Sequence, residues 1–477
     1  MKNLKTVFGF FIGLLAAQWS QAACDQTLNP GANVATAISN AAAGSTICLN
    51  AGSYGMADVY RIVKSADVTV QSVSGRTASL APRINQSNHI KFQNLTLTNL
   101  EIDTNQQGGT KNITVLNNTF TGQAVVNVGN NSNANILFEG NTFDGISVCA
   151  DCFEGRLEVI ASPWTSQSSG VTILRNHFGN RGESDGIQIG AAGVVIDGNI
   201  FDGIQQGSYG RHVDALQLYG SSHTTIINNY FANGTTYIMA PDGGESEIIK
   251  NNVFVGTPEY YWKIQLGSHD NDVFTHNTVI NAGVSIDKKV GNSPSTNAIV
   301  QNNILIAGGG FKTTDSAGAE SCTNCTFSYN LFQSGARGTN NIIGVPTFVG
   351  GANPSSWSGY QLASSSLGYK AGNDGQDMGT NYYGSGSVTP PPPPPPVLVA
   401  PTNLRVVSLA YNQVKVQWDS SSSSQSGFIV NRKAGSGSYA QAASVSSSTL
   451  SYTDAAVAAS TQYCYQVKAY DSSSQSA

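Results

Sequence analysis

Two short stretches of this 477-residue sequence combine side chains that can transfer protons. They are Asp185-Gly-Ile-Gln-Ile-Gly190 and Arg211-His-Val-Asp-Ala-Leu-Gln-Leu-Tyr-Gly220, and each joins an aspartate to an alternating apolar, polar, apolar run. Two carboxylates, a histidine and an arginine in one patch are the groups that acid–base catalysis uses. The two stretches meet only if they occupy neighbouring strands, so the surrounding repeat decides this hypothesis.

A repeat with a period of 23 to 27 residues sets the spacing of these strands. Each unit has a β-branched run, an asparagine, one variable residue and then an apolar residue, usually Phe. Strands at this period without a helical pattern indicate a solenoid. We predict an all-β right-handed parallel β-helix (solenoid), in which the asparagines stack at a turn and the phenylalanines stack inside. The repeated asparagines are Asn94, Asn118, Asn141, Asn176, Asn199, Asn229, Asn252, Asn277, Asn303 and Asn330.

Two intervals of the repeat are longer, at 35 and 30 residues. The surplus falls at 144–157 and 202–213, just before strands with an outward polar residue. Loops on a rigid scaffold often carry function. We therefore predict that two loops on the same corner form the wall of a groove.

The alternation predicts a polar row along this groove, with one residue from each coil. Stacked strands lie about 4.8 Å apart, so such a row extends over several sugar units. The predicted row is Asn127, Glu158, Gln188, Gln217, Met239, Gln265, Asp287 and Lys312. Around it, charged and aromatic residues gather in a chain whose charged fraction is only 11%. They are Arg156, Asp185, Arg211, His212, Asp214, Tyr237, Asp242, Tyr260, Tyr261, Trp262, Lys263, His269 and Lys288.

A secreted β-helix with a polar groove resembles the polysaccharide lyases that cleave pectate and alginate. The resemblance covers residues 24–380 and rests on the repeat period, the N-terminal cap and the groove. It implies β-elimination on a uronic acid: a base removes the proton beside the carboxylate, a cation neutralises that carboxylate, and a donor protonates the leaving oxygen. The candidate catalytic residues are Lys263, His212, Arg211 and Tyr237. The candidate substrate-binding residues are Gln188, Gln217, Gln265, Tyr261, Trp262 and Lys288.

Three aspartates could hold Ca²⁺, namely Asp185, Asp214 and Asp242, because oxygen ligands from adjacent coils suit that ion. No other cofactor is expected. Some pectate lyases bind calcium in this way, so the resemblance implies the same possibility here.

A second resemblance concerns the same two aspartates. Ser184-Asp-Gly-Ile-Gln-Ile-Gly190 looks like the Asn-Thr-Asp-Gly segment of polygalacturonase-type hydrolases, which implies hydrolysis by Asp185 and Asp214. The adjacent Asp-Asp and the Gly-His-Gly of those hydrolases are missing. Alginate C5-epimerases share the fold, but their Asp-Pro-His motif is absent.

Structural roles compete with each catalytic assignment. Asp185 and Asp214 share the parity of the inward Ile and Leu residues, so they could cap turns by accepting backbone hydrogen bonds. The glutamine row could be a solvated ladder, and Tyr261 and Trp262 could pack under a loop. A non-catalytic carbohydrate-binding or adhesin β-helix is therefore the alternative from a different class.

The N-terminus predicts export. Lys2 and Lys5 precede an apolar stretch that ends at Ala22 and Ala23, so residues 1–23 read as a signal peptide. Cys24 follows directly, but Gln21 stands where bacterial lipoprotein signals usually have Leu. We expect an extracellular or periplasmic protein.

Seven cysteines fit an oxidising compartment. Four of them form two CxxC motifs, at Cys149 and Cys152 and at Cys322 and Cys325, and this spacing also occurs in zinc sites. Their wide separation and the lack of nearby histidines favour disulfides. Proximity suggests Cys24–Cys48, Cys149–Cys152 and Cys322–Cys325. Cys464 is left unpaired, and we expect it to be a buried, inert thiol.

The chain divides into a solenoid over 24–380, a linker over 381–399 with seven prolines at 390–396, and a module over 400–477. A short N-terminal helix is expected to cover the first coil. The module has alternating strands, and its Pro401-Thr-Asn-Leu404, Trp418 and Tyr463 resemble a fibronectin type III β-sandwich.

The remaining expectations concern partners. A net charge of −5 with no basic run gives no indication of nucleic-acid binding. No further apolar run approaches the ~20 residues of a membrane span. We expect a monomer whose partner is an acidic polysaccharide.

Overall fold

The computed structural model divides into two units, 1–387 and 388–477, and each is described by itself. Among the residues that it describes, no helix is long and apolar enough to cross a membrane. Some of the predicted features lie outside the described residues. They are most of the signal peptide, most of the linker, Cys149, Cys152, Arg211, His212 and Tyr260. The described residues are 23–104, 109–129, 134–146, 155–161, 169–179, 182–206, 213–257, 261–288, 293–308, 310–382, 400–420, 425–470 and 475–476.

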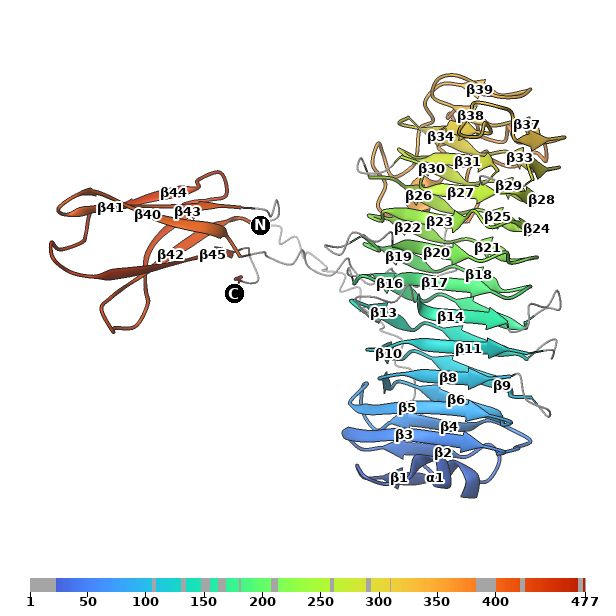
Figure 1. The fold of residues 1–477 in the computed structure, drawn as a ribbon, viewed down its shortest axis with the longest axis horizontal. Coiled ribbons are helices and arrows are strands. Elements are labelled where there is room, and N and C mark those ends of the chain that lie inside the picture. Colours follow the sequence, from blue (N-terminus) through green and yellow to red (C-terminus); the bar gives the residue numbers. More distant parts are fainter. Residues whose placement is uncertain are drawn as a thin grey trace, which may run out of the picture. The chain divides into compact units, whose positions relative to one another are not determined.

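The first unit is a parallel β-solenoid of about 11 turns, which confirms the predicted stacking of coils (Figure 1). Each full coil contributes one strand to each of three stacks. The first stack contains β1 (Gln26–Leu28), β2 (Thr46–Leu49), β4 (Val68–Ser72), β6 (Asn88–Gln93), β9 (Lys111–Leu116), β12 (Ile136–Glu139), β15 (Val171–Leu174), β18 (Val195–Asp197), β21 (Thr225–Ile227), β25 (Ile248–Lys250), β29 (Val273–Thr275), β33 (Ile299–Gln301) and β37 (Thr326–Ser328).

The other two stacks join into one sheet through β5. The second stack contains β3 (Gly52–Tyr60), β5 (Ala78–Asn85), β8 (Leu100–Asp103), β11 (Ala124–Val128), β14 (Gly155–Ala161), β17 (Asp185–Gly190), β20 (Asp214–Leu218), β23 (Thr236–Ala240), β27 (Ile264–Gly267), β31 (Gly283–Asp287) and β35 (Gly310–Lys312). The third contains β7 (Thr96–Leu97), β10 (Thr119–Phe120), β13 (Thr142–Asp144), β16 (His177–Gly179), β19 (Ile200–Asp202), β22 (Tyr230–Ala232), β26 (Val253–Val255), β30 (Thr278–Ile280), β34 (Ile304–Ile306), β38 (Leu331–Phe332) and β39 (Ile342–Ile343).

A fourth, shorter stack lies at a corner of the later coils. It contains β24 (Gly244–Glu245), β28 (His269–Asp270), β32 (Ser295–Thr296) and β36 (Cys322–Thr323). In the chain, this corner follows the second stack and precedes the first.

The asparagine ladder is present at the turn between the first and third stacks. From Asn118 to Asn303, each backbone N–H donates to the Oδ1 of the next asparagine at 2.8–3.0 Å. Each Nδ2 donates to the same oxygen at 2.9–3.2 Å. The prediction was wrong at Asn94, because Leu95 donates to Asn118 and so occupies the first rung.

The phenylalanines two residues after the ladder stack inside the solenoid, as predicted. From Phe120 to Phe254, successive ring centroids lie 4.1–5.0 Å apart, and the rings are buried. Full burial of such a side chain contributes about 1.5–3 kcal/mol, so this column is a major source of stability.

The helix α1 (Val34–Asn40) lies at the N-terminal end of the stack (Figure 1). Asn33 caps it by accepting the Thr36 N–H at 2.9 Å, and three apolar side chains on its inner face are buried in the core. The Cys24–Cys48 disulfide lies at the same end, and Cys322–Cys325 closes a tight turn near the other end. Both pairs agree with the prediction from proximity.

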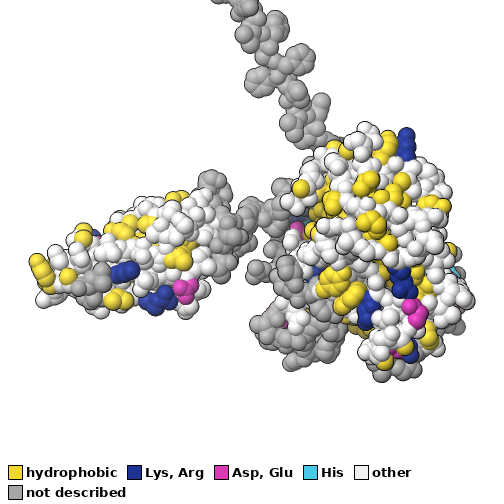
Figure 2. All heavy atoms as spheres, turned by 90° about the horizontal axis from the view of Figure 1, so that it is seen from above, with side chains coloured by type: hydrophobic (Ala, Val, Ile, Leu, Met, Phe, Trp, Pro, Cys, Tyr) yellow, Lys and Arg dark blue, Asp and Glu magenta, His cyan; other side chains and the backbone are white. Residues whose placement is uncertain are grey.

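The segment after the last coil runs back along the third stack. Its Trp357, Tyr360 and Met378 form a second core with outward residues of that stack such as Val253 and Leu331. This segment includes a 3₁₀ helix, η1 (Trp357–Tyr360). We call the buried outer side of β22, β26, β30, β34 and β38 the covered face. Figure 2 looks onto the β39 end, where apolar side chains are scattered among other kinds.

The second unit has two three-stranded antiparallel sheets. One contains β40 (Thr402–Ala410), β41 (Gln413–Asp419) and β44 (Ser451–Asp454); the other contains β43 (Ala440–Ser446), β42 (Gly427–Ala434) and β45 (Tyr463–Tyr470). Trp418 and Phe428 lie in its core. Cys464 is unpaired, as predicted, but it is partly exposed and not buried. The fibronectin type III resemblance stays a prediction.

Candidate functional site

The outer side of the second stack carries the predicted row, and we call it the polar face. The strand register aligns one residue from each of eleven strands along it. At about 4.8 Å per strand, the row is roughly 48 Å long. It consists of Asp58, Arg83, Glu101, Val125, Glu158, Gln188, Gln217, Met239, Gln265, Ser285 and Lys312.

Two members of the predicted row were wrong. Asn127 pairs with Asp103 and Ile160, and Asp287 pairs with Gly267, so both lie two residues along the strand from the row. Val125 and Ser285 take their places. The other six members align as predicted.

The predicted surplus segments lie between β13 and β14 and between β19 and β20. Both connect the third stack to the polar face, as expected from the repeat. Residues 147–154 and 207–212 within them are outside the described residues, and this includes Arg211 and His212. By sequence, His212 stands two residues before Asp214, the first residue of β20.

Asp185 holds the start of the next strand. Its Oδ1 accepts the backbone N–H of Asp214 at 2.8 Å, and its Oδ2 accepts the Gln188 side chain at 2.9 Å. Asp185 is 7% exposed and Asp214 is fully buried. Asp185 therefore has the capping role that its inward parity suggested, and it also orients one glutamine of the row.

Tyr219 is a candidate that the sequence reasoning missed. It follows β20 and is partly exposed. Burial raises the pKa of its phenol, and the nearby carboxylates of Asp185, Asp214, Glu158 and Asp242 raise it further, to about 12. Tyr219 therefore keeps its proton at neutral pH and lies near four carboxylates. Its parity matches that of Gln217, which was the available signal.

Lys263 and Tyr237 do not reach the polar face. Lys263 is fully buried, and its Nζ donates to Gly234 O at 2.7 Å, Thr235 O at 2.9 Å and Thr257 Oγ1 at 3.0 Å. The hydroxyl of Tyr237, also fully buried, donates to Val255 O. These contacts hold the turn before β23, so we do not retain either residue as a group that contacts substrate. Arg156 is likewise buried and donates to Phe143 O and Gly179 O.

An aromatic pair lies at the C-terminal part of the polar face. The rings of Tyr261 and Trp262 meet edge to face, with centroids 4.7 Å apart and an interplanar angle of 81°. A side chain at Gly283 would overlap both rings, at 2.5 Å, so the glycine lets them lie close to the strand. The Lys312 ammonium lies 5.8 Å from the Trp262 centroid and 3.1 Å from Asp287.

This arrangement suits an acidic sugar, because an aromatic ring can pack against the sugar while Lys312 contacts its carboxylate. Gln265, in the row beside it, donates to Trp262 O at 3.3 Å. Lys288 pairs with Asp315 at 3.2 Å and is one-third exposed. The structure thus brings together Tyr261, Trp262 and Gln265.

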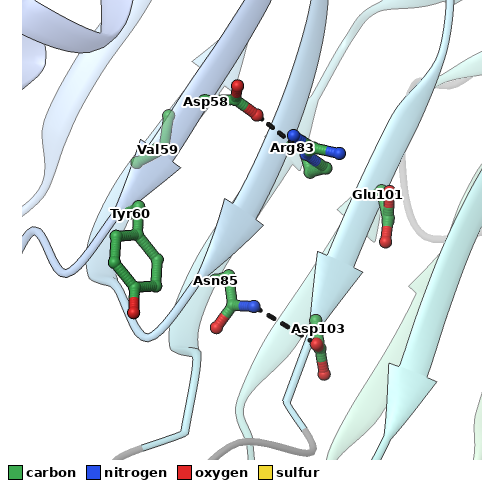
Figure 3. A pocket seen from close by; sticks show the side chains of 7 residues that line it. All are labelled: Asp58, Val59, Tyr60, Arg83, Asn85, Glu101 and Asp103. Atoms are coloured by element: carbon green, nitrogen blue, oxygen red, sulfur yellow. Dashed lines mark hydrogen bonds and ion pairs between the residues drawn. The ribbon is translucent and has the colours of Figure 1, made fainter.

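A hollow of about 440 Å³ lies at the N-terminal end of the polar face (Figure 3). It is lined by neighbouring strands β3, β5 and β8. Arg83 pairs with Asp58 at 2.7 Å, Asn85 donates to Asp103 at 3.3 Å, and Tyr60 is half exposed. The sequence reasoning missed this hollow, because its row began at Asn127.

The solved structures similar to this chain include two polysaccharide lyases. No family model and no curated protein matches this chain. Among solved structures, a family 6 polysaccharide lyase from Pseudopedobacter saltans is 12% identical, with a TM-score of 0.43 over 67% of this chain and 91% of that chain. A mannuronic acid specific family 6 lyase from human gut microbiota is 15% identical, with a TM-score of 0.43 over 67% and 82%.

Proposed function

We propose that this protein is an exported lyase that cleaves a uronate-containing polysaccharide by β-elimination on the polar face. The observation that supports it is the aligned row of eleven residues, with the Tyr261–Trp262 pair and Lys312 at one end. An extended polymer fits a row of this length. The third stack cannot offer an equivalent surface over β22–β38, because the C-terminal segment covers it.

The chemistry needs a base and a proton donor on either side of the bond that breaks. The base removes the proton beside the uronate carboxyl, a double bond forms, and the glycosidic C–O bond breaks. The donor then protonates the leaving oxygen. We assign the base to His212, beside Arg211, and the donor to Tyr219, whose phenol is protonated at neutral pH.

The carboxylates around Tyr219 also bear on the metal. Glu158, Asp214 and Asp242 would repel a uronate unless a cation lay between them. The donor set is all oxygen, which suits Ca²⁺. We therefore retain calcium as a proposal, with Asp214 and Asp242 as ligands; Asp185 fits less well because both of its oxygens already accept hydrogen bonds. Bound calcium would neutralise the substrate carboxylate.

The test is incubation of the full chain with alginate, pectate and other uronans, with calcium or with a chelator. We expect an ultraviolet-absorbing unsaturated product from at least one uronan, with a lower rate after chelation. New reducing ends without that absorbance would overturn elimination and favour the hydrolase that uses Asp185 and Asp214. Binding with neither product would indicate a carbohydrate-binding β-helix.

A further inference from the structure

Three ionisable side chains are buried together beneath the short corner stack. Glu247 is 0% exposed, His269 is 1% exposed and Asp272 is 2% exposed. They come from the turn after β24, from β28 and from the turn after β28. Buried charges are found paired or bound to metals, so this group needs an explanation.

The contacts of His269 fix which ring nitrogen carries hydrogen. Its Nε2 lies 3.0 Å from the backbone oxygen of Ala240, which can only accept a hydrogen bond, so Nε2 is the donor. Its Nδ1 faces two carboxylate oxygens, Glu247 Oε2 at 3.3 Å and Asp272 Oδ2 at 3.0 Å. A positive species must therefore lie at Nδ1, either a proton or a metal ion.

Each carboxylate is held by its other oxygen. Ser221 Oγ donates to Glu247 Oε1 at 3.3 Å, and the Glu247 backbone N–H donates to Asp272 Oδ1 at 3.1 Å. Within the described part of the chain, the buried Asp272 Oδ2 accepts no hydrogen bond of good geometry. Metal-binding histidines and carboxylates are commonly held in this way by outer partners.

The three remaining atoms converge. Nδ1 of His269 and one oxygen each of Glu247 and Asp272 lie within 4.8 Å of one another. The backbone of Gly244 lies beside these atoms. A Cβ at this position would lie 2.9 Å from Nδ1 and 2.8 Å from Ser221 O, so only glycine fits there without a shift.

The charges of the group also match a divalent ion. A neutral imidazole with two carboxylates has a charge of −2, which such an ion cancels. The group thus attracts positive charge at Nδ1.

We propose that Glu247, His269 and Asp272 bind a structural divalent transition-metal ion, with Zn²⁺ as the best fit. Zinc bonds to nitrogen and oxygen of about 2.0–2.2 Å place tetrahedral ligands about 3.3 Å apart. The contacts of Nδ1 at 3.0 and 3.3 Å are close to that separation. The ion fixes the corner where β23 ends at Ala240, two residues before Asp242, whose charge acts on Tyr219.

The test begins with the purified full chain. Elemental analysis is expected to give one zinc per chain. Removal of zinc by a strong chelator is expected to lower the melting temperature, with restoration by Zn²⁺ but not by Ca²⁺ or Mg²⁺. Glu247→Gln and Asp272→Asn are each expected to reduce the bound zinc at least tenfold. The matched control is Glu245→Gln, an exposed acid two residues from Glu247, which is expected to keep full zinc content.

A chain that contains no metal and whose melting temperature ignores both chelator and Zn²⁺ would overturn the proposal, because protons alone would then hold the group. Metal content and melting do not depend on elimination activity, so this inference stands or fails separately from the proposed function. Asp242→Asn, which changes a proposed calcium ligand, separates the two proposals. A loss of zinc caused by this substitution would also overturn the zinc assignment.

Discussion

The asparagine ladder with its phenylalanine column, here called the Asn–Phe corner, is built from the same coils as the polar face. The two regions differ in how the residues change from coil to coil. At the corner, the same asparagine and usually the same phenylalanine recur, and each repeats the same hydrogen bond or ring contact. On the polar face, the aligned residue changes at almost every strand. Repetition serves stacking, whereas variation lets one surface hold acidic, aromatic and basic regions in order.

Two lysines show the same contrast at the level of single side chains. Lys263 is fully buried and donates to three acceptors of the solenoid. Lys312 is one-third exposed, pairs with Asp287 and faces Trp262. Residue type alone does not separate a structural cation from a cation that is available to a ligand; its acceptors do.

The largest expected effect is on catalysis. His212→Ala removes the proposed base and should reduce the rate of unsaturated-product formation by about 100- to 10,000-fold, without a change in melting temperature. His223→Ala, at an exposed turn on the first stack, is the control and should keep full activity. Near-full activity of the His212 variant would refute the assignment of the base.

The next effect concerns the buried lysine. Lys263→Met leaves Gly234 O, Thr235 O and Thr257 Oγ1 without their shared donor, so it should lower the free energy of unfolding by about 2–4 kcal/mol. The matched Lys312→Met variant should unfold like the native chain but bind uronan less tightly. Denaturant titration and binding measurements on both variants would check this difference; a reversal would show that the roles of the two lysines are exchanged.

The aromatic pair gives a smaller effect. Trp262→Ala removes a ring that can pack against sugar, so KM should rise about tenfold, which corresponds to about 1.4 kcal/mol of binding. The rate at saturating substrate should change less. A fall in kcat with an unchanged KM would instead place Trp262 beside the reacting bond.

The smallest effect is expected at the N-terminal hollow. Arg83→Ala breaks an exposed ion pair with Asp58, so the melting temperature should not change. If a long polymer extends along the polar face, KM should rise for long chains and stay the same for short oligomers. An equal KM for both lengths would exclude the hollow from substrate binding.

The sequence predicted the parts of the fold that repeat. The asparagine and phenylalanine spacing requires stacked coils, because one coil cannot bury its own apolar side. Errors arose where the repeat is weak, at Asn94, and where the row was placed two residues too far along the strand, at Asn127 and Asp287. Strand alternation cannot distinguish two positions that are two residues apart, because both point to the same face of the sheet.

The candidate site was less predictable. Lys263 comes directly before β27, where alternation gives no direction, and its side chain instead reaches the carbonyls of a neighbouring turn. Tyr219 could have been found from its parity with Gln217. Of the Glu247, His269 and Asp272 group, the sequence analysis named only His269, which it placed near the polar row and which is buried. The group could not be predicted, because turns from successive coils bring it together.

The packing of the C-terminal segment has a consequence for biosynthesis. Thr380 Oγ1 donates to Asn251 O at 2.9 Å, across 129 residues of sequence. During synthesis, the apolar outer side of β22, β26, β30, β34 and β38 therefore stays uncovered until the segment around Met378 has been made. Such contacts between distant residues form slowly and leave a partly folded chain prone to aggregate. Truncation before this segment should therefore yield a stack of coils that aggregates and needs chaperones to stay in solution.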